Sequence, residues 1–431
     1  MILKKGIAFV LCALVFSGAV FAGPSSQASS DKPFAGTVVN SLIFTSLDTE
    51  YIINVLAPKL KAETGIELRV DQVPYEDIRA RQLADATGGK RYDIINPCTE
   101  WSYEYAQFAT PLTKYIGRSD YPNVEINDMI PYVWKEFNGG SDVYWFPYQP
   151  DTRIFFYRTD LLSAEGLSEP KTWTDVLNVA KALTKDTNGD GRIDQYGFGF
   201  PARRGWNLTL AWAPLLFAAG GELFDANDRP VFNSQAGIDA INFLIELKKY
   251  CPPDIDAYGE HELNENAKNG LIAMGISASG ITPELEAPGI PVKGKVKSIA
   301  FPVKPGATAK YSACLGGWAF GVSSYSKKAD AAAYTVMWLT DRANVANMQI
   351  NGRQHASRLS QAQNPQLLAV NPHVSAIVSI LEKSVIFYHG VEGAQIGEVL
   401  NVRIAQAVSG EMDPKAALDA AIRDVTPMLR K

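Results

Sequence analysis

Two side chains that can bind a polar ligand follow directly after a short apolar segment. Residues 92–95 read as a strand, and Glu100 and Trp101 come just beyond its end. The carboxylate of Glu100 can accept hydrogen bonds, and the indole of Trp101 offers a flat face for stacking. These are the groups that hold a hydroxylated molecule with an apolar face. A surface helix that begins at this point is the alternative explanation of both residues.

Similar groups follow other predicted turns and strands. Asp151 lies in a turn between two extended segments, and Ser279 follows the strand-like residues 272–276. Trp318 follows two glycines, the second of which is Gly317, and their small size lets backbone approach a ligand closely. We predict these four residues as ligand contacts. The alternatives are that Asp151 only caps the next turn and that Trp318 packs in the core.

One loop carries oxygen-bearing side chains at the spacing of a calcium loop. Asp186, Asn188, Asp190 and Asp194 stand where the first nine residues of an EF-hand loop place their oxygen ligands. The twelfth position is Gly197, where that loop has a bidentate glutamate. We interpret the loop as a plain turn, with a structural Ca²⁺ held by these four residues as the alternative. No other cofactor is required.

Motifs of the common enzyme classes are missing from the sequence. There are 4 histidines, and none has the spacing of metal ligands. No GxSxG, no P-loop and no GxGxxG after a strand occurs. We therefore predict a protein that binds its ligand without transforming it.

The elements that must position these residues alternate between strand and helix. Residues 37–44, 66–70 and 92–95 are β-rich, and residues 49–61 and 75–86 have apolar side chains at helical spacing. This alternation predicts an α/β fold with a mostly parallel sheet. Ligands of such sheets bind beyond the carboxyl ends of the strands.

The length of the chain and two extended segments predict two lobes. A chain of 431 residues exceeds what a single hydrophobic core usually serves. Residues 143–157 and 296–302 are extended, and the chain between them forms a separate run of helices and loops. Chain that leaves one lobe, builds another and returns is typical of a two-lobed clamp.

The N-terminus predicts export. Residues 1–22 have a basic start, an apolar run and small residues before a cleavage site after Ala22, as in a secretory signal peptide. An uncleaved anchor helix is the alternative. Cys12 lacks a lipobox, which favours a periplasmic protein over a lipoprotein. Residues 23–32 read as a flexible leader.

Composition excludes several classes of protein. With 46% hydrophobic and 20% charged residues the chain is ordinarily globular. The net charge of -5 and the lack of a basic block argue against nucleic acid as a partner. Cys98, Cys251 and Cys314 are an odd number of cysteines in the mature chain, and we interpret them as buried apolar side chains, with one disulfide bond as the alternative.

Several short motifs occur in a characteristic order, although each alone is weak. In this order the chain resembles the extracellular solute-binding proteins of sugar-type ABC importers, the family of maltose- and polyol-binding proteins. The resemblance covers nearly all of the mature chain and rests on Tyr92-Asp93-Ile94-Ile95, residues 107–112, 144–148 and 156–161, Pro170-Lys171-Thr172-Trp173, residues 194–198, 270–274 and 315–318, Ser326-Lys327 and residues 409–418.

The resemblance implies a periplasmic-binding-protein fold, also called a Venus flytrap, with two lobes and three crossings. We expect the N-lobe to comprise residues 33–147 plus 302–322 and the C-lobe residues 148–301 plus 323–431, with the third crossing near residues 319–323. The ligand would lie between the lobes, and a permease with ATPase subunits would be the membrane partner of a monomer.

The resemblance also implies further binding residues. Trp206 stands in the second-lobe loop where the family supplies an aromatic ring. Arg358 matches a loop motif of the family but lacks its proline, so a structural ion pair is the alternative. Tyr388 stands where the family has a proline–aromatic segment, from which this sequence departs.

The function implied is that of a periplasmic binding protein that captures a sugar, sugar alcohol or short oligosaccharide and delivers it to an ABC importer. The alternative is an exported carbohydrate-active hydrolase, because the paired carboxylates of a glycosidase come from distant strands and leave no local motif. A sensory receptor that docks a membrane kinase is a third interpretation.

Overall fold

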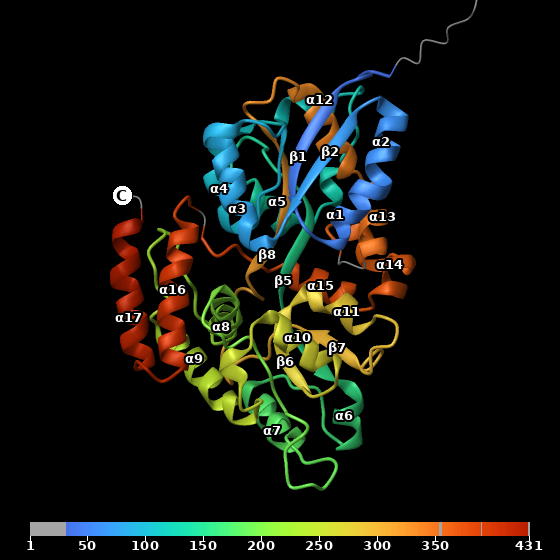
Figure 1. Ribbon diagram of the computed structural model, residues 1–431. Coiled ribbons are helices and arrows are strands. Elements are labelled where there is room, and N and C mark those ends of the chain that lie inside the picture. Colours follow the sequence, from blue (N-terminus) through green and yellow to red (C-terminus); the bar gives the residue numbers. More distant parts are fainter. Residues whose placement is uncertain (1–31, 353–355, 389, 430–431) are drawn as a thin grey trace, which may run out of the picture.

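The chain folds into two lobes placed one above the other (Figure 1). The computed structural model describes residues 32–352, 356–388 and 390–429. The predicted signal peptide and all of the leader except Lys32 lie outside the described residues. Within the described ranges, no helix is both long enough and apolar enough to cross a membrane.

The first lobe is built on the predicted strand–helix–strand pattern. Strand β1 (Val38–Phe44) pairs in parallel with β2 (Glu67–Val73) over their full lengths, and also with β3 (Ile94–Ile95). Helix α1 (Leu47–Tyr51), a π-helical turn (Ile52–Leu56) and α2 (Ala57–Thr64) connect β1 to β2. The expected strands and helices of this region are confirmed.

The second helix of this connection ends at a glycine, three residues beyond the predicted range 49–61. Gly65 follows α2 with a φ of 82°, a left-handed conformation that favours glycine. A Cβ at this position would lie 2.6 Å from the Cα of Ala35, so the close approach of the N-terminal segment also requires glycine.

One long strand belongs to both lobes. Strand β5 (Phe146–Arg158) pairs antiparallel with β8 (Leu315–Ser323) through its first half and with β6 (Met274–Ala278) and β7 (Val296–Ile299) through its second half. The sheet order is β2-β1-β3-β8-β5-β6, and β4 (Ala109–Thr110) pairs with β8. The two lobes therefore share one continuous mixed sheet. The expectation of a mostly parallel sheet is wrong, because among the described strands only the pairs of β1 with β2 and β3 are parallel, and β5 and β8 pair antiparallel with all their neighbours.

The pairing of β5 with β8 is irregular near the junction of the lobes. The register shifts between Pro147 and Gln149, which marks a bulge. Pro150 lies opposite Gly317, whose φ of 112° is in the region that favours glycine. A Cβ on Gly317 would lie 2.3 Å from the carbonyl oxygen of Gln149. Glycine is thus required at Gly317 by backbone packing.

Helices cover the sheet in both lobes (Figure 1). In the first lobe these are α3 (Tyr75–Ala84), α4 (Thr99–Tyr105), α5 (Pro131–Phe137), α12 (Ala329–Leu339) and α13 (Arg342–Gly352), and α14 (Pro365–Val370) lies at the junction. In the second lobe they are α6 (Thr159–Ala164), α7 (Trp173–Leu183), α8 (Trp206–Ala218), α9 (Gln235–Leu247), α10 (Glu260–Lys268), α11 (Thr282–Leu285), α15 (Val374–Leu381), α16 (Gly393–Val408) and α17 (Pro414–Val425).

Helices α12 and α13 lie on the first lobe, whereas the sequence analysis assigns residues 323–431 to the second. The indole nitrogen of Trp338 donates to Glu63 at 2.9 Å. Lys59 donates to Asn344, also at 2.9 Å, so both helices are tied to α2. The third crossing therefore follows α13, beyond the expected position at residues 319–323.

Residues 302–313 lie on the second lobe instead of the expected first lobe. The backbone N–H of Lys304 donates to Ala218 at 3.0 Å, and its ammonium pairs with Asp239. Strand β7 pairs with β5 inside the second lobe, so residues 296–302 are not a crossing. The chain returns to the first lobe along β8.

The three cysteines of the described chain are buried and free. Cys98 precedes α4, Cys251 follows α9, and Cys314 precedes β8. Burial raises the pKa of each thiol, to about 12 for Cys314. A protonated thiol packed in this way behaves as a small apolar side chain.

A candidate ligand-binding site between the lobes

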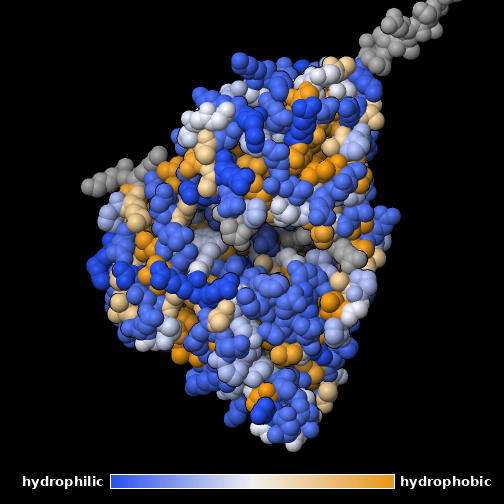
Figure 2. All heavy atoms as spheres, viewed as in Figure 1, coloured by the Kyte–Doolittle hydropathy of each residue, from blue (hydrophilic) through white to orange (hydrophobic). Residues whose placement is uncertain are grey.

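A pocket of about 320 Å³ lies between the lobes, where the molecular surface is hollowed (Figure 2). It has a size within the range of ligand sites, which starts near about 300 Å³. The first lobe contributes Arg79 of α3 and two residues of α4, and the second lobe contributes α8 and α16. The lining residues are Arg79, Glu100, Trp101, Trp206, Ala394, Gln395, Glu398 and Asn401.

Helix α4 positions the first-lobe side of the pocket. It begins at Thr99, directly after β3, because Cys98 is extended and forms a bridge with Trp318 of β8. Glu100 therefore falls in the first turn, and Trp101 is largely buried with its edge on the pocket. Both predicted residues are at the junction of the lobes.

Helix α8 positions the second-lobe side. Trp206 is its first residue and follows Gly205, and its indole nitrogen donates a hydrogen bond to Glu100 at 3.1 Å. This bond joins the two lobes directly. Two predicted ligand contacts from opposite lobes therefore touch each other.

The charges around the pocket suit a ligand that donates hydrogen bonds. Glu100 and Glu398 are acceptors on opposite lobes. Arg79 is the basic residue among the described lining residues, and its guanidinium already pairs with Glu104 at 2.8 Å. An anionic ligand would meet two carboxylates here, whereas hydroxyl groups can donate to both.

Trp318 supports the pocket without lining it. Its ring stacks on Phe44 with centroids 4.0 Å apart and meets the edge of Trp101 at 5.7 Å. The side chain is only 6% exposed. The stacking partner of Trp318 in this structure is thus Phe44, and we assign Trp318 the role of holding the ring of Trp101 in place.

Asp151 and Ser279 lie together near the crossing. The hydroxyl of Ser279 donates to the carboxylate of Asp151 and accepts from the backbone N–H of Thr152 at 3.2 Å. A Cβ on Gly316 would contact Asp151, so the pair lies beside β8. They join β5 to β6 in the second lobe and do not line the pocket described above.

A buried polar network in the second lobe was not predicted. Arg153 of β5 pairs with Glu260 at 2.6 Å and donates to Asn207 at 2.7 Å. Ser277 and the N–H of Ala278 donate to the other oxygen of Glu260, both at 2.6 Å. Because Asn207 adjoins Trp206, the network fixes the start of α8. The signal for this network in the sequence was Arg153, a charged residue within an apolar strand.

Asp48 is a second residue that the sequence analysis missed. It is 1% exposed, and neither carboxylate oxygen has a hydrogen-bond partner among the described residues. Burial raises the pKa of Asp48 to about 8. Gly352 leaves room for it, since a Cβ there would lie 2.0 Å from Asp48 Oδ1. The signal in the sequence was that Asp48 follows the carboxyl end of β1, because ligands of parallel sheets bind beyond such strand ends.

The hydroxyl of Tyr148 faces the same region. Burial raises its pKa well above the usual value, and the neighbouring Asp48 carboxyl raises it further. Tyr148 stacks on Phe320 at 4.1 Å, which fixes it on the sheet. A hydrogen bond with the Asn96 side chain opposes the rise of this pKa, so Asp48 is the more isolated of the two groups.

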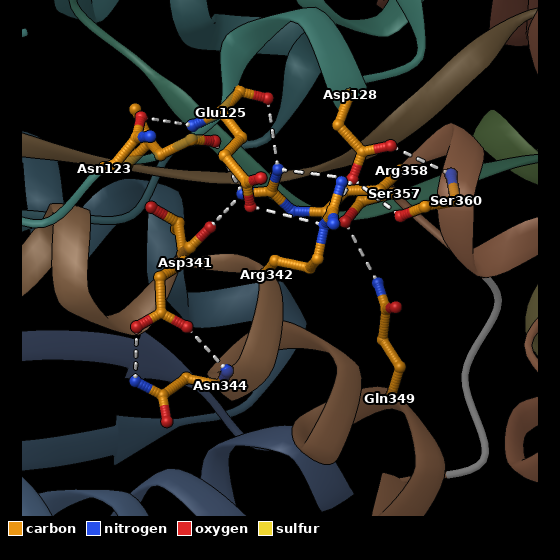
Figure 3. A network of polar contacts seen from close by, with 12 residues as sticks. Asn123, Glu125, Asp128, Asp341, Arg342, Asn344, Gln349, Ser357, Arg358 and Ser360 are labelled. Carbon is orange, nitrogen blue, oxygen red and sulfur yellow. Dashed lines mark hydrogen bonds and ion pairs between the residues drawn. The ribbon is translucent and has the colours of Figure 1, made fainter. Parts of the chain in front are cut away.

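Arg358 lies away from the pocket, inside the first lobe (Figure 3). Its side chain is 0% exposed. It donates to the carbonyl oxygens of Val124 at 2.9 Å, Thr340 at 2.5 Å and Glu125 at 3.3 Å. Desolvation lowers the pKa of the guanidinium, and Asp128 opposes this. The expected ligand contact does not fit this placement, because Arg358 is enclosed by backbone that it holds together.

Replacing Arg358 with lysine should therefore lower stability and leave affinity unchanged. A lysine cannot donate to three carbonyl groups in the fork geometry of a guanidinium. We expect a loss of about 2 kcal/mol in the free energy of unfolding, from the scale for hydrogen bonds to charged groups. Urea unfolding measures it, and a weaker ligand affinity with unchanged stability would return Arg358 to the site.

Tyr388 lies beside the pocket at the second lobe. Its ring contacts Phe224 with centroids 4.8 Å apart, and it lines a narrow space together with Trp206 and Phe387. It therefore borders the junction as expected, although it does not line the pocket between α4 and α16. The following residue, His389, lies outside the described residues.

The loop of the candidate calcium site satisfies its own oxygens. Asp186 accepts from the N–H groups of Gly189 and Gly191, both at 2.7 Å. Asp194 accepts from Thr187, and Asn188 and Asp190 each accept from a backbone N–H two residues on. In the described part of the chain, no group of three or more His, Cys, Asp or Glu could hold a metal ion. The candidate ligand set is thus not assembled in this arrangement.

Known proteins resemble the chain over both lobes. Relatives include a probable amino-acid ABC transporter periplasmic-binding protein of Sinorhizobium fredii, 26% identical over 98% of this chain and 96% of that protein. The mannitol-binding protein of Pseudomonas aeruginosa is 26% identical over 80% of this chain and 82% of its own length.

Solved structures share the fold. A solute-binding protein of Agrobacterium radiobacter in complex with ribitol has a TM-score of 0.80 at 23% identity and covers 92% of this chain and 100% of its own. The maltose-bound MalE3 of T. maritima also has a TM-score of 0.80, at 20% identity, over 91% and 100% of the two chains. Residues 46–346, well over half of the sequence, match the model of one family, and the chain belongs to that family, the bacterial extracellular solute-binding proteins.

Proposed function

We propose that the protein captures a small neutral sugar or sugar alcohol between its lobes. The observation that carries this proposal is the pocket in which Trp101 and Glu100 of one lobe face Trp206 and Glu398 of the other. Rings supply faces for C–H groups, and carboxylates accept hydrogen bonds from hydroxyls. Related structures with ribitol, maltose or D-mannitol support this ligand class.

We further propose that the protein is exported, cleaved after Ala22 and monomeric in the periplasm, where it delivers its ligand to an ABC permease and ATPase. The family name supports export, and the names of two relatives support an ABC transporter. The ligand is released intact in this proposal, so the protein is not an enzyme. Closure of the lobes over the ligand would present the bound state to the permease.

Thermal unfolding with a panel of solutes tests the ligand class. We expect a rise in Tm with ribitol, mannitol, glucose or maltose, because a ligand at 100 times its Kd stabilises the native state by about 2.7 kcal/mol. Amino acids serve as the comparison, given the name of the Sinorhizobium relative. A shift with amino acids alone contradicts the proposal, and recovery of a hydrolysed glycan after long incubation supports the hydrolase instead.

Replacing Trp101 with alanine tests whether the ligand binds in this pocket. A tryptophan that contacts the ligand contributes about 2 kcal/mol on the scale of binding hot spots, so Kd should rise about 30-fold. Asp190→Ala, in the exposed loop of the second lobe, is the control and should bind normally. An unchanged Kd for Trp101→Ala, measured by calorimetry, would place the ligand elsewhere.

A further inference from the structure

A second and larger hollow lies next to the pocket but is separated from it. It has a volume of about 720 Å³ and is bordered by Tyr103 of the first lobe, by residues 227–230 and by α17. A narrow space of about 10 Å³ lies between the two hollows. That space shares Glu100 and Trp206 with the pocket and shares Tyr388 with the larger hollow.

Trp206 lines both the pocket and the narrow space, so its ring stands in the passage between these two. Its nitrogen donates to Glu100 across the lobes at 3.1 Å, and its ring meets the edge of Phe387 with centroids 4.9 Å apart. On its other side Trp206 packs against Gly397 of α16, where a Cβ would lie 2.4 Å from the ring carbon Cζ3. Three contacts from three elements therefore fix one orientation of the indole.

Gly397 makes this orientation available. Gly397 lies on the buried side of α16. Glycine is unfavourable in the interior of a helix unless packing requires it. An alanine at this position would overlap the indole, and an aromatic ring has no flexible end that could move aside. The absence of a side chain at residue 397 thus allows the tryptophan to occupy the passage between the pocket and the narrow space.

We infer that Trp206, held by Glu100 and Gly397, closes the pocket at one end and restricts the ligand to the size of one monosaccharide or sugar alcohol. This role of Trp206 rests on the proposed function and adds an upper limit to the length of the ligand. A pocket of about 320 Å³ is at the small end of ligand sites and suits such a molecule. A longer glycan that extends from the pocket toward the narrow space meets the indole.

Calorimetric titration of mannitol, glucose, maltose and maltotriose into the wild-type protein and three variants tests the inference. The wild type should bind one of the short ligands, mannitol or glucose, at least 100-fold more tightly than maltose or maltotriose. Trp206→Ala should reduce this ratio at least 10-fold, because removal of the ring opens the passage. Gly397→Ala should reduce the ratio in the same direction by displacing the ring.

Trp206→Phe is the matched variant. It keeps an aromatic ring in the passage and loses the hydrogen bond to Glu100, so most of the ratio should remain. It also serves as the control for misfolding, because the phenyl ring retains the packing against Gly397. Two results would contradict the inference. Trp206→Ala could weaken the affinity for every ligand by the same factor, or Trp206→Phe could abolish the preference for short ligands as fully as Trp206→Ala does. In either case the ring does not limit the length of the ligand.

The outcomes separate this inference from the function it rests on. If the wild type binds maltotriose as tightly as the short ligands, the limit of length is refuted and the proposed ligand class stands. If the wild type binds none of the four carbohydrates, the proposed function fails and the inference fails with it.

Discussion

Replacing Asp48 with asparagine is expected to remove a pH dependence of several kcal/mol from the stability of the protein. Burial raises the pKa of Asp48 from 3.8 to about 8 in the folded state. Below pH 3.8 the carboxyl is protonated in both states and burial adds no ionisation cost. As the pH rises toward 8, the unfolded state loses this proton while the folded state keeps it, so stability falls.

The measurement is urea unfolding of both proteins at pH 5 and pH 7. Each pH unit corresponds to about 1.4 kcal/mol for one group, so the wild type should lose about 3 kcal/mol relative to Asp48→Asn between these values. Asp77→Asn, on the exposed surface of α3, is the control and should follow the wild type. Parallel pH profiles of wild type and Asp48→Asn would contradict the burial of an unpartnered carboxyl.

The same substitution tests whether Asp48 serves the ligand. The Asp48 carboxyl has no hydrogen-bond partner among the described residues, and a buried polar group without a partner is costly. We therefore expect Asp48→Asn to unfold at higher urea than the wild type at pH 7, and a decrease in affinity beside this gain would place Asp48 at the ligand. A gain in stability without any change in Kd would show that Asp48 is outside the binding site.

Replacing Trp318 with alanine is expected to destabilise the protein by about 3–5 kcal/mol, the range for removal of a large buried aromatic side chain. The ring stacks on Phe44 of β1 and supports Trp101, and β8 connects both lobes. Its loss would leave a cavity between the first-lobe sheet and α4. The free energy of unfolding from urea titration measures the effect.

Trp318→Phe provides the comparison for this position. A phenyl ring can still stack on Phe44, so less than half of the loss is expected. Ligand affinity should decrease in Trp318→Ala because Trp101 loses its support. If Trp318→Ala instead unfolds like the wild type and has lost its affinity, then Trp318 contacts the ligand directly, as its two preceding glycines first suggested.

The sequence was sufficient for the architecture of the first lobe. Local alternation of β-rich and helical segments placed β1, α2 and β2 within a few residues. The distribution of later segments between lobes was not predictable in the same way. Residues 302–313 and helix α12 are positioned by long-range contacts such as Lys304 with Asp239 and Trp338 with Glu63.

The candidate site was predicted in part. Glu100, Trp101 and Trp206 were named from strand ends and resemblance, and the structure brings them to one pocket. Arg358 was not distinguishable as structural, because the carbonyl groups that it binds are remote in sequence. Asp48 carried the same strand-end signal as Glu100, but its burial depends on Gly352, which lies about three hundred residues further along the chain.

The irregular part of β5 has a mechanical consequence. Pro147 and Pro150 lack the N–H that a strand gives to its neighbour, and the bulge between Pro147 and Gln149 interrupts the ladder further. The sheet is therefore most compliant over these few residues, while regular pairing stiffens it on both sides. We expect the two lobes to rotate relative to each other about this single region, and the twist of β5 and β8 to set the direction of the rotation.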